Sequence, residues 1–218
     1  MTLAMKKPRV WDADFVLMDG TTVHIRAIGP DDHARLQRFH ASLSPETIYF
    51  RFFSGHTTLS SQELHAFCKV DFADRMAFVA VGSDGEIVAV GRYDRTEGSD
   101  EAEVAFTVTD AYQERGLATI LLDHLAAYAI TKGIRRFAAE TLAENRKMRE
   151  VLRHAGFAEH EEFDGVGIHV EMNIEPTRES LAAVEERVPT AAVHSDAEAA
   201  YLQRDLASRL GRTSRHTA

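Results

Sequence analysis

The first regular pattern along the chain is an alternation of apolar and polar residues on both sides of Asp19-Gly20, in the stretch FVLMDGTTVHIRAI. A period of two indicates half-buried strands, and an Asp-Gly dipeptide supplies the positive φ angles of a tight hairpin turn. Apolar runs at 76–81 and 87–92 bracket Ser83-Asp84-Gly85 in the same way, and a third run, 101–108, follows the polar loop TEGSD. The pattern predicts a hairpin and then an antiparallel meander of three strands.

Between the hairpin and the meander, the periodicity is helical. Three helix start signals occur there: Pro30-Asp31-Asp32, Ser44-Pro45-Glu46, and Ser60 with Glu63 three residues later. Proline, early carboxylates and a Ser-x-x-Glu capping box are all typical of helix N-termini. We expect one helix ending near Ser42, followed by two short helices.

The second half of the compact region begins with the longest predicted helix, which starts at Leu117 and ends at Gly133. A strand at 136–141, a helix at 145–154 and two strands around 158–163 and 167–174 follow. The order is mixed α and β and contains one strand–helix–strand unit. We therefore expect an α+β fold with helices on both faces of the sheet.

The outer segments differ in composition from this region. We expect residues 1–14 to be an N-terminal extension, 15–175 to form the domain, and 176–218 to form a helical appendage with a basic tail. The last segment is polar and alanine-rich, and Ser195 with Glu198 caps a plausible helix in it. A surface or oligomer-contact helix and a partner-binding arm both remain open for it.

Composition excludes several classes of protein. The 218 residues carry a formal net charge of −9, which argues against a general nucleic-acid binder. Cys68 is the only cysteine, so neither a disulfide framework nor a cysteine zinc site is expected, and the histidines lack metal-site spacing. Since no apolar leader or membrane span is visible in the sequence, we expect a cytoplasmic protein that binds no membrane and no metal.

The most informative stretch is AEVAFTVTDAYQERGLATILLDHL, residues 102–125. It places a carboxylate, Glu103, in a strand and a glycine turn at Gly116 directly before a helix. Such a turn exposes unpaired N–H groups at the positive end of the helix dipole, where a phosphate can bind. The Lys-Ser/Thr pair of a P-loop and the three glycines of a dinucleotide fold are absent from the turn. On its own, one glycine at a helix start is typical of a plain turn.

The neighbouring residues carry a family resemblance. The hexapeptide QERGLA, residues 113–118, matches Gln/Arg-x-x-Gly-x-Gly/Ala, and over roughly residues 15–174 the chain resembles the GNAT superfamily of CoA-dependent N-acyltransferases. The strand EVAFTV and the later ENRKMREVLRHAGF support the resemblance. More narrowly, LSPETIYFRFF and AEVAFTVTDAYQERG are similar to bacterial protein-lysine acetyltransferases of the Pat type. We expect no regulatory domain of the kind fused to some of them.

The resemblance implies a fold and a donor site. The fold would be a mixed, mostly antiparallel sheet that is splayed between two central parallel strands, and the co-substrate would be acetyl-CoA. Pantetheine would lie along Phe106, Thr107 and Val108, and Asn145 would contact it, with a simple helix cap as the open alternative. The pyrophosphate would bind the amides of Gln113, Glu114, Arg115, Gly116, Leu117, Ala118 and Thr119.

The resemblance also implies a catalytic group, because Glu103 occupies the place of the family's general base. A lysine amine, with an unperturbed pKa of about 10.4, must lose a proton before it attacks a thioester. Desolvation in an apolar strand would make Glu103 a better proton acceptor. The alternative is that Glu103 simply faces solvent. Leu152 stands where many members carry a tyrosine acid, so water would protonate the leaving thiolate, and an N–H near Thr107 would stabilise the oxyanion.

The expected activity is acetyl transfer to a lysine of a protein such as an acyl-CoA synthetase. A small amine or polyamine acceptor remains open, as does a non-catalytic acetyl-CoA-binding regulator. The oligomeric state also stays open, with a homodimer among the arrangements. The aromatic residues of 49–53 favour a core position, although Tyr49 and Arg51 are candidates for the acceptor side.

Overall fold

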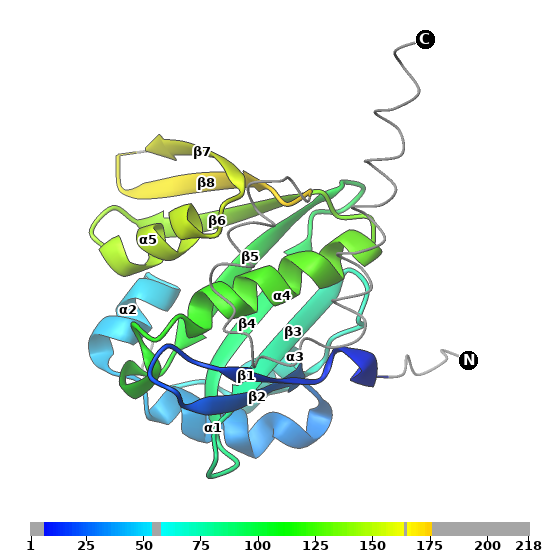
Figure 1. Cartoon of the computed structure of the whole chain (residues 1–218), viewed down its shortest axis with the longest axis vertical. Coiled ribbons are helices and arrows are strands. Elements are labelled where there is room, and N and C mark those ends of the chain that lie inside the picture. The colour runs from blue at the N-terminus through cyan, green and yellow to red at the C-terminus, as the bar shows by residue number, and fades with distance from the viewer. Residues whose placement is uncertain (1–6, 54–57, 164, 176–218) are drawn as a thin grey trace.

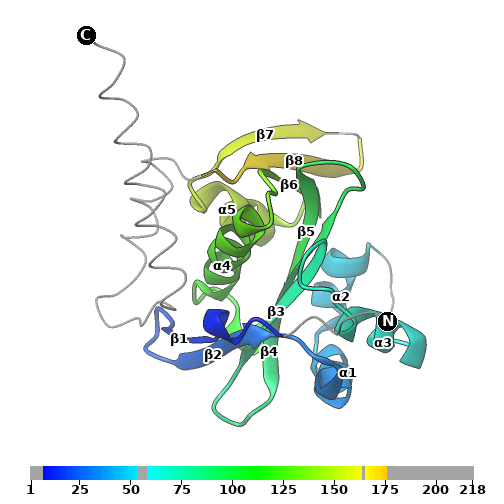
Figure 2. The ribbon, with the colours of Figure 1, turned by 90° about the vertical axis from the view of Figure 1, so that its right-hand side faces the viewer.

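The computed structural model describes residues 7–53, 58–163 and 165–175. The helices expected within 176–218, including the one capped by Ser195 and Glu198, lie outside the described residues. In the described part, one sheet carries helices on both of its faces (Figures 1 and 2). This arrangement confirms the predicted α+β class.

The sheet has eight strands in the order β1-β2-β3-β4-β5-β6-β8-β7. The strands are β1 (Ala13–Val16), β2 (Thr22–Ala27), β3 (Arg75–Val81), β4 (Ile87–Arg95), β5 (Glu101–Val108), β6 (Arg136–Leu142), β7 (Ala158–Phe163) and β8 (Gly167–Asn173). The α-helices are α1 (His33–Ala41), α2 (Pro45–Phe52), α3 (Ser61–Cys68), α4 (Leu117–Thr131) and α5 (Arg146–His154). Every predicted element of the domain is present, with bounds within a few residues of those expected.

The N-terminal hairpin starts earlier than the expected domain boundary at residue 15. Ala13 opens β1 and is buried, and Trp11 lies before it in the core, edge-on to the rings of His124 and Tyr128. Buried aromatic residues dominate core energetics, so residues 11–14 belong to the domain rather than to the extension.

Alternation along β5 assigns its two faces to different cores. Ala102, Val104, Phe106 and Val108 are buried in a cluster with the apolar residues of α4. The opposite face of the sheet packs against α1, α2 and α3, which form a second cluster, and Figure 2 shows these helices across the sheet from α4 and α5. Gly91 on β4 permits the close packing on the α4 side, since a Cβ there would lie 2.9 Å from Phe106 Cδ1 and 3.0 Å from Leu125 Cδ1.

The sheet separates between its two parallel strands. β5 pairs with β6 only from Glu101↔Arg136 to Glu103↔Ala138, whereas β5 stays paired with β4 through Val108 and β6 stays paired with β8 through Leu142. The C-terminal halves of β5 and β6 therefore diverge and leave a wedge between them. This observation confirms the predicted splayed sheet.

Among the described residues, no helix has the length and the apolar character that a membrane span requires, and this includes α4, the longest.

Candidate active site

The wedge is bordered by main-chain groups of β5 that β6 does not use. The Thr109 N–H donates to Val88 O at 2.9 Å, and hydrogen-bonded pairs alternate along an antiparallel ladder. Odd-numbered residues of β5 therefore bond to β4, and beyond the last β5–β6 pair Phe106 and Val108 direct their main-chain groups into the wedge. In agreement, Gln113 Nε2 donates to Val108 O at 3.2 Å from that side. Phe106 and Val108 thus present backbone to the wedge, whereas the main chain of Thr107 faces β4.

The N-terminus of α4 carries a run of free donors. Gly116 adopts φ +83°, a left-handed conformation that glycine takes without strain, and the first helical bond runs from Ile120 N–H to Gly116 O. Within the described part of the chain, the backbone N–H groups of residues 116–119 donate to no acceptor. Such a cluster at the positive end of a helix suits a phosphate group. The residues present therefore fit a pyrophosphate.

The β1–β2 hairpin supports this turn from outside. Met18 N–H donates to Arg115 O at 3.2 Å, and Arg115 Nη1 donates to Asp19 Oδ2 at 2.6 Å. The Arg115 guanidinium also lies over the Tyr112 ring, 5.1 Å from its centroid. The side chain of Arg115 is thus engaged with the hairpin, and its N–H group is what it offers to a ligand.

A lysine that we did not predict from the sequence lies beside the same turn. Lys147 Nζ, on α5, is 2.8 Å from Glu114 Oε1 and 3.2 Å from Gln113 Oε1. The hydrogen bond from Lys147 lowers the pKa of Glu114, and the same bond raises the pKa of Lys147. The sequence did contain a signal for this residue, because Lys147 lies two residues after Asn145, on a helix that we expected to contact the donor. Lys147 therefore offsets the negative charge that Glu114 brings to the turn.

The turn is also bonded to α2, on the other side of the sheet. Asp110 accepts hydrogen bonds from Ser44 N–H, Ser44 Oγ and Thr47 Oγ1, and Gln113 Nε2 donates to Thr47 Oγ1 at 3.1 Å. Burial would raise the pKa of Asp110, but these hydrogen bonds outweigh it and lower the pKa. Ser44 is the N-cap of α2, so a single polar network holds both the helix start and the turn.

Glu103 lies at the last paired position of β5 on the β6 side, opposite Asp94 on the β4 side. Its side chain is exposed, so the expectation that an apolar strand desolvates it is wrong. Because side chains alternate along a strand, Glu103 shares its face with Ala105 and Thr107. The alternative that Glu103 faces solvent therefore describes its exposure correctly. Further along β5, helices α1–α3 cover the same face of the sheet.

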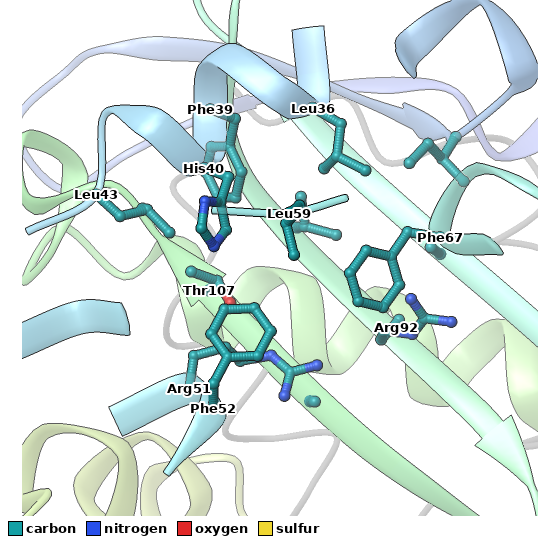
Figure 3. A pocket seen from close by; sticks show the side chains of 14 residues that line it. Leu36, Phe39, His40, Leu43, Arg51, Phe52, Leu59, Phe67, Arg92 and Thr107 are labelled. Carbon is teal, nitrogen blue, oxygen red and sulfur yellow. The ribbon is translucent and has the colours of Figure 1, made fainter. Parts of the chain in front are cut away.

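A hollow lies on this face, between the sheet and helices α1, α2 and α3. We name it the arginine hollow because Arg51 of α2 and Arg92 of β4 line it together with Ala105 and Thr107 (Figure 3). Arg51 was a candidate for the acceptor side, whereas Tyr49 is exposed outside the hollow. We missed Arg92, although a charge within the apolar run of β4 was a visible signal.

Two further positions bear on the donor site. Asn145 is buried and caps α5 through Oδ1, which accepts the Met148 N–H at 3.1 Å. Its amide nitrogen is not needed for that cap. Leu152 is only 1% exposed and packs in the core, so it offers no proton donor where many family members place a tyrosine.

Comparison with known proteins agrees with this geometry. The model of the acetyltransferase (GNAT) family matches residues 42–157. The chain belongs to the GNAT family. It is accordingly an N-acetyltransferase that uses acetyl-CoA as its donor.

Among GNAT relatives, an acetyltransferase of Pseudomonas aeruginosa, PA5475, is 36% identical over 144 residues, 65% of this chain and 77% of its own. The acetyltransferase Pat of Mycolicibacterium smegmatis is 35% identical over 140 residues, and the chain spans only 41% of its length. The crystal structure of the GNAT domain of S. lividans PAT is 43% identical, with a TM-score of 0.73 over 77% of this chain and 99% of that domain. These matches confirm the resemblance to Pat-type acetyltransferases.

Proposed function

We propose that the chain transfers the acetyl group of acetyl-CoA directly to a lysine amine of a protein, with Glu103 as general base. The observation that carries the proposal is the position of Glu103, at the point where β5 and β6 separate. Bound in the wedge, acetyl-CoA supplies an activated thioester. An accessible carboxylate at this point can take the ammonium proton directly or through a water.

The roles on the donor side follow from the directions of the main-chain groups. Phe106 and Val108 present main-chain groups to pantetheine. The main chain of Thr107 faces β4, so Thr107 offers only its side chain, which lies on the face of the sheet covered by α1–α3. The N–H groups of residues 114–119 hold the pyrophosphate, with Gln113 bracing the turn and Lys147 balancing the charge of Glu114. Asn145 keeps an amide N–H₂ for the pantetheine arm beyond its capping bond. A wedge-facing N–H next to Thr107 stabilises the oxyanion.

Sequence similarity supports a lysine acceptor. The segments LSPETIYFRFF and AEVAFTVTDAYQERG resemble bacterial protein-lysine acetyltransferases, and relatives named Pat are 35% and 43% identical to this chain. The acceptor we propose is a cytoplasmic protein such as an acyl-CoA synthetase. Since Leu152 carries no proton, water protonates the leaving thiolate.

Release of CoA thiol tests the acceptor class. We expect release with an acyl-CoA synthetase bearing an exposed lysine, and none above background with spermidine or without an acceptor. Turnover of spermidine without turnover of the protein would overturn the lysine proposal, and CoA release with any amine excludes a non-catalytic regulator.

A further inference from the structure

The arginine hollow combines an apolar wall with two guanidinium groups. Its other lining residues include Leu36, Phe39 and Leu43 of α1, and Phe67 of α3. Ligand pockets in proteins are lined mostly by apolar and aromatic side chains, with a few polar groups that fix orientation. The hollow has this mixed lining. Its composition therefore suits a small ligand with an apolar body.

Arg92 is positioned rigidly in this hollow. Its side chain is buried, Arg92 Nε donates to Asp94 Oδ2 at 3.0 Å, and the guanidinium lies over the Phe67 ring at 4.9 Å. Asp94 also accepts a bond from Arg75 Nε at 2.8 Å. One carboxylate is thus shared by two arginines, so it does not fully neutralise Arg92.

Arg51 is the less compensated of the two cations. It is half-buried over the Phe52 ring, at 5.2 Å from its centroid, and no carboxylate of the described residues lies within ion-pair distance of its guanidinium. Burial and the charge of Arg92 lower the pKa of Arg51, against the opposing influence of Glu103 and Asp94. Figure 3 shows both guanidinium groups reaching toward the same end of the hollow. That end has excess positive charge.

We propose that the arginine hollow binds a small monocarboxylate with an apolar body, whose carboxylate lies between Arg51 and Arg92. A planar guanidinium offers paired N–H donors that match the two oxygens of a carboxylate, and low polarity around the pair strengthens such bonds. The aliphatic and aromatic walls contact the apolar body. An ammonium group is repelled at the same end, so the hollow selects acids over amines.

The position of the hollow gives this ligand a consequence for transfer. Ala105 and Thr107 form part of its floor, and they follow Glu103 on the same face of β5. A bound carboxylate therefore lies on the side of the sheet from which the acceptor amine must approach. It competes with the acceptor and leaves the wedge on the β6 side free for acetyl-CoA.

Binding of 4-methylpentanoate to the full-length protein tests the proposal by calorimetry, with 4-methylpentanamide as the uncharged probe of the same shape. We expect saturable binding of the acid at concentrations up to about 10 mM and at least tenfold weaker binding of the amide. Arg51→Gln should weaken binding of the acid about tenfold or more, and Arg51→Lys should restore part of it.

Arg38→Gln on α1 is the matched control, because Arg38 pairs with Glu86 on the surface and does not line the hollow. It should bind the acid as the wild type does. Equal binding of acid and amide, an unchanged affinity in Arg51→Gln, or no saturable binding of the acid would each overturn the proposal. None of these outcomes depends on acetyl transfer, so the proposed function can stand or fail separately.

Discussion

Asp94 and Glu103 face each other across the β4–β5 ladder, yet only Asp94 is held by arginines. Directly opposed side chains in an antiparallel pair have Cβ atoms about 4.5–5.5 Å apart, so two like charges meet there. Arg75 and Arg92 compensate the charge of Asp94. Within the described part of the chain, Glu103 makes no ion pair. Of the two carboxylates, Glu103 is therefore the one that no arginine of the described residues holds.

Replacing Glu103 by Gln should lower kcat by about 10²–10⁴-fold, because the amide cannot accept the ammonium proton. Binding of acetyl-CoA should be unchanged, and both can be measured from about pH 6 to pH 9. Glu101→Gln is the matched control, since Glu101 shares the strand and face but pairs with Arg136. Wild-type turnover of Glu103→Gln across this range would show that another group is the base.

Gly116→Glu should abolish binding of acetyl-CoA, because a carboxylate at the start of α4 repels a pyrophosphate. Gly133→Glu is the control, since Gly133 at the other end of α4 has φ +80°, close to the +83° of Gly116. Both variants should lose a similar ~1–2 kcal/mol of stability from the left-handed backbone. Calorimetry should find binding only in the Gly133 variant; binding by the Gly116 variant would contradict the pyrophosphate site.

Asp32→Asn should reduce the free energy of unfolding by about 3–5 kcal/mol near neutral pH, since it leaves a largely buried Arg26 unpaired. Asp32 accepts two hydrogen bonds of 2.7 Å from Arg26 and one of 2.9 Å from Gly29 N–H. Burial alone would raise the pKa of Asp32, but these bonds lower it overall.

The sign of the pH dependence follows from that lowered pKa. The stabilisation by Asp32 is fully present above its unfolded pKa, about 3.9, and is lost as the pH falls through the folded value. In denaturant titrations, the difference in unfolding free energy between wild type and Asp32→Asn should narrow as the pH falls below about 4. If this difference in unfolding free energy stays constant with pH, the ion pair between Asp32 and Arg26 is not its source.

Cys68 should react slowly with a thiol reagent in the native protein and rapidly in denaturant. Burial raises the pKa of this thiol to about 11, so little reactive thiolate is present at pH 8. Since Cys68 is the only cysteine of the chain, the signal from the reacted thiol reagent reports on this site alone. Complete labelling of the native protein within the mixing time would show that the end of α3 opens readily.

The elements of the domain and the donor half of the site could be predicted from the sequence because their signals are local. Asp19-Gly20 marks a turn, and residues 113–119 form one continuous motif. The exposure of Glu103, the register that places Asp94 opposite it, and the approach of Lys147 to Glu114 depend on pairing between distant segments. Periodicity indicates that successive side chains lie on opposite faces of a strand, but it does not show which helices cover each face of the sheet.

The hydrogen bonds that Thr47 makes to Asp110 and Gln113 have a consequence for engineering acceptor specificity. Because they join the start of α2 to the turn at the donor site, residues 44–47 and 110–113 form one structural unit. A chimera that takes only α2 from a relative would leave Asp110 and Gln113 facing a foreign helix start. Exchanging both segments together is the minimal graft that preserves the join.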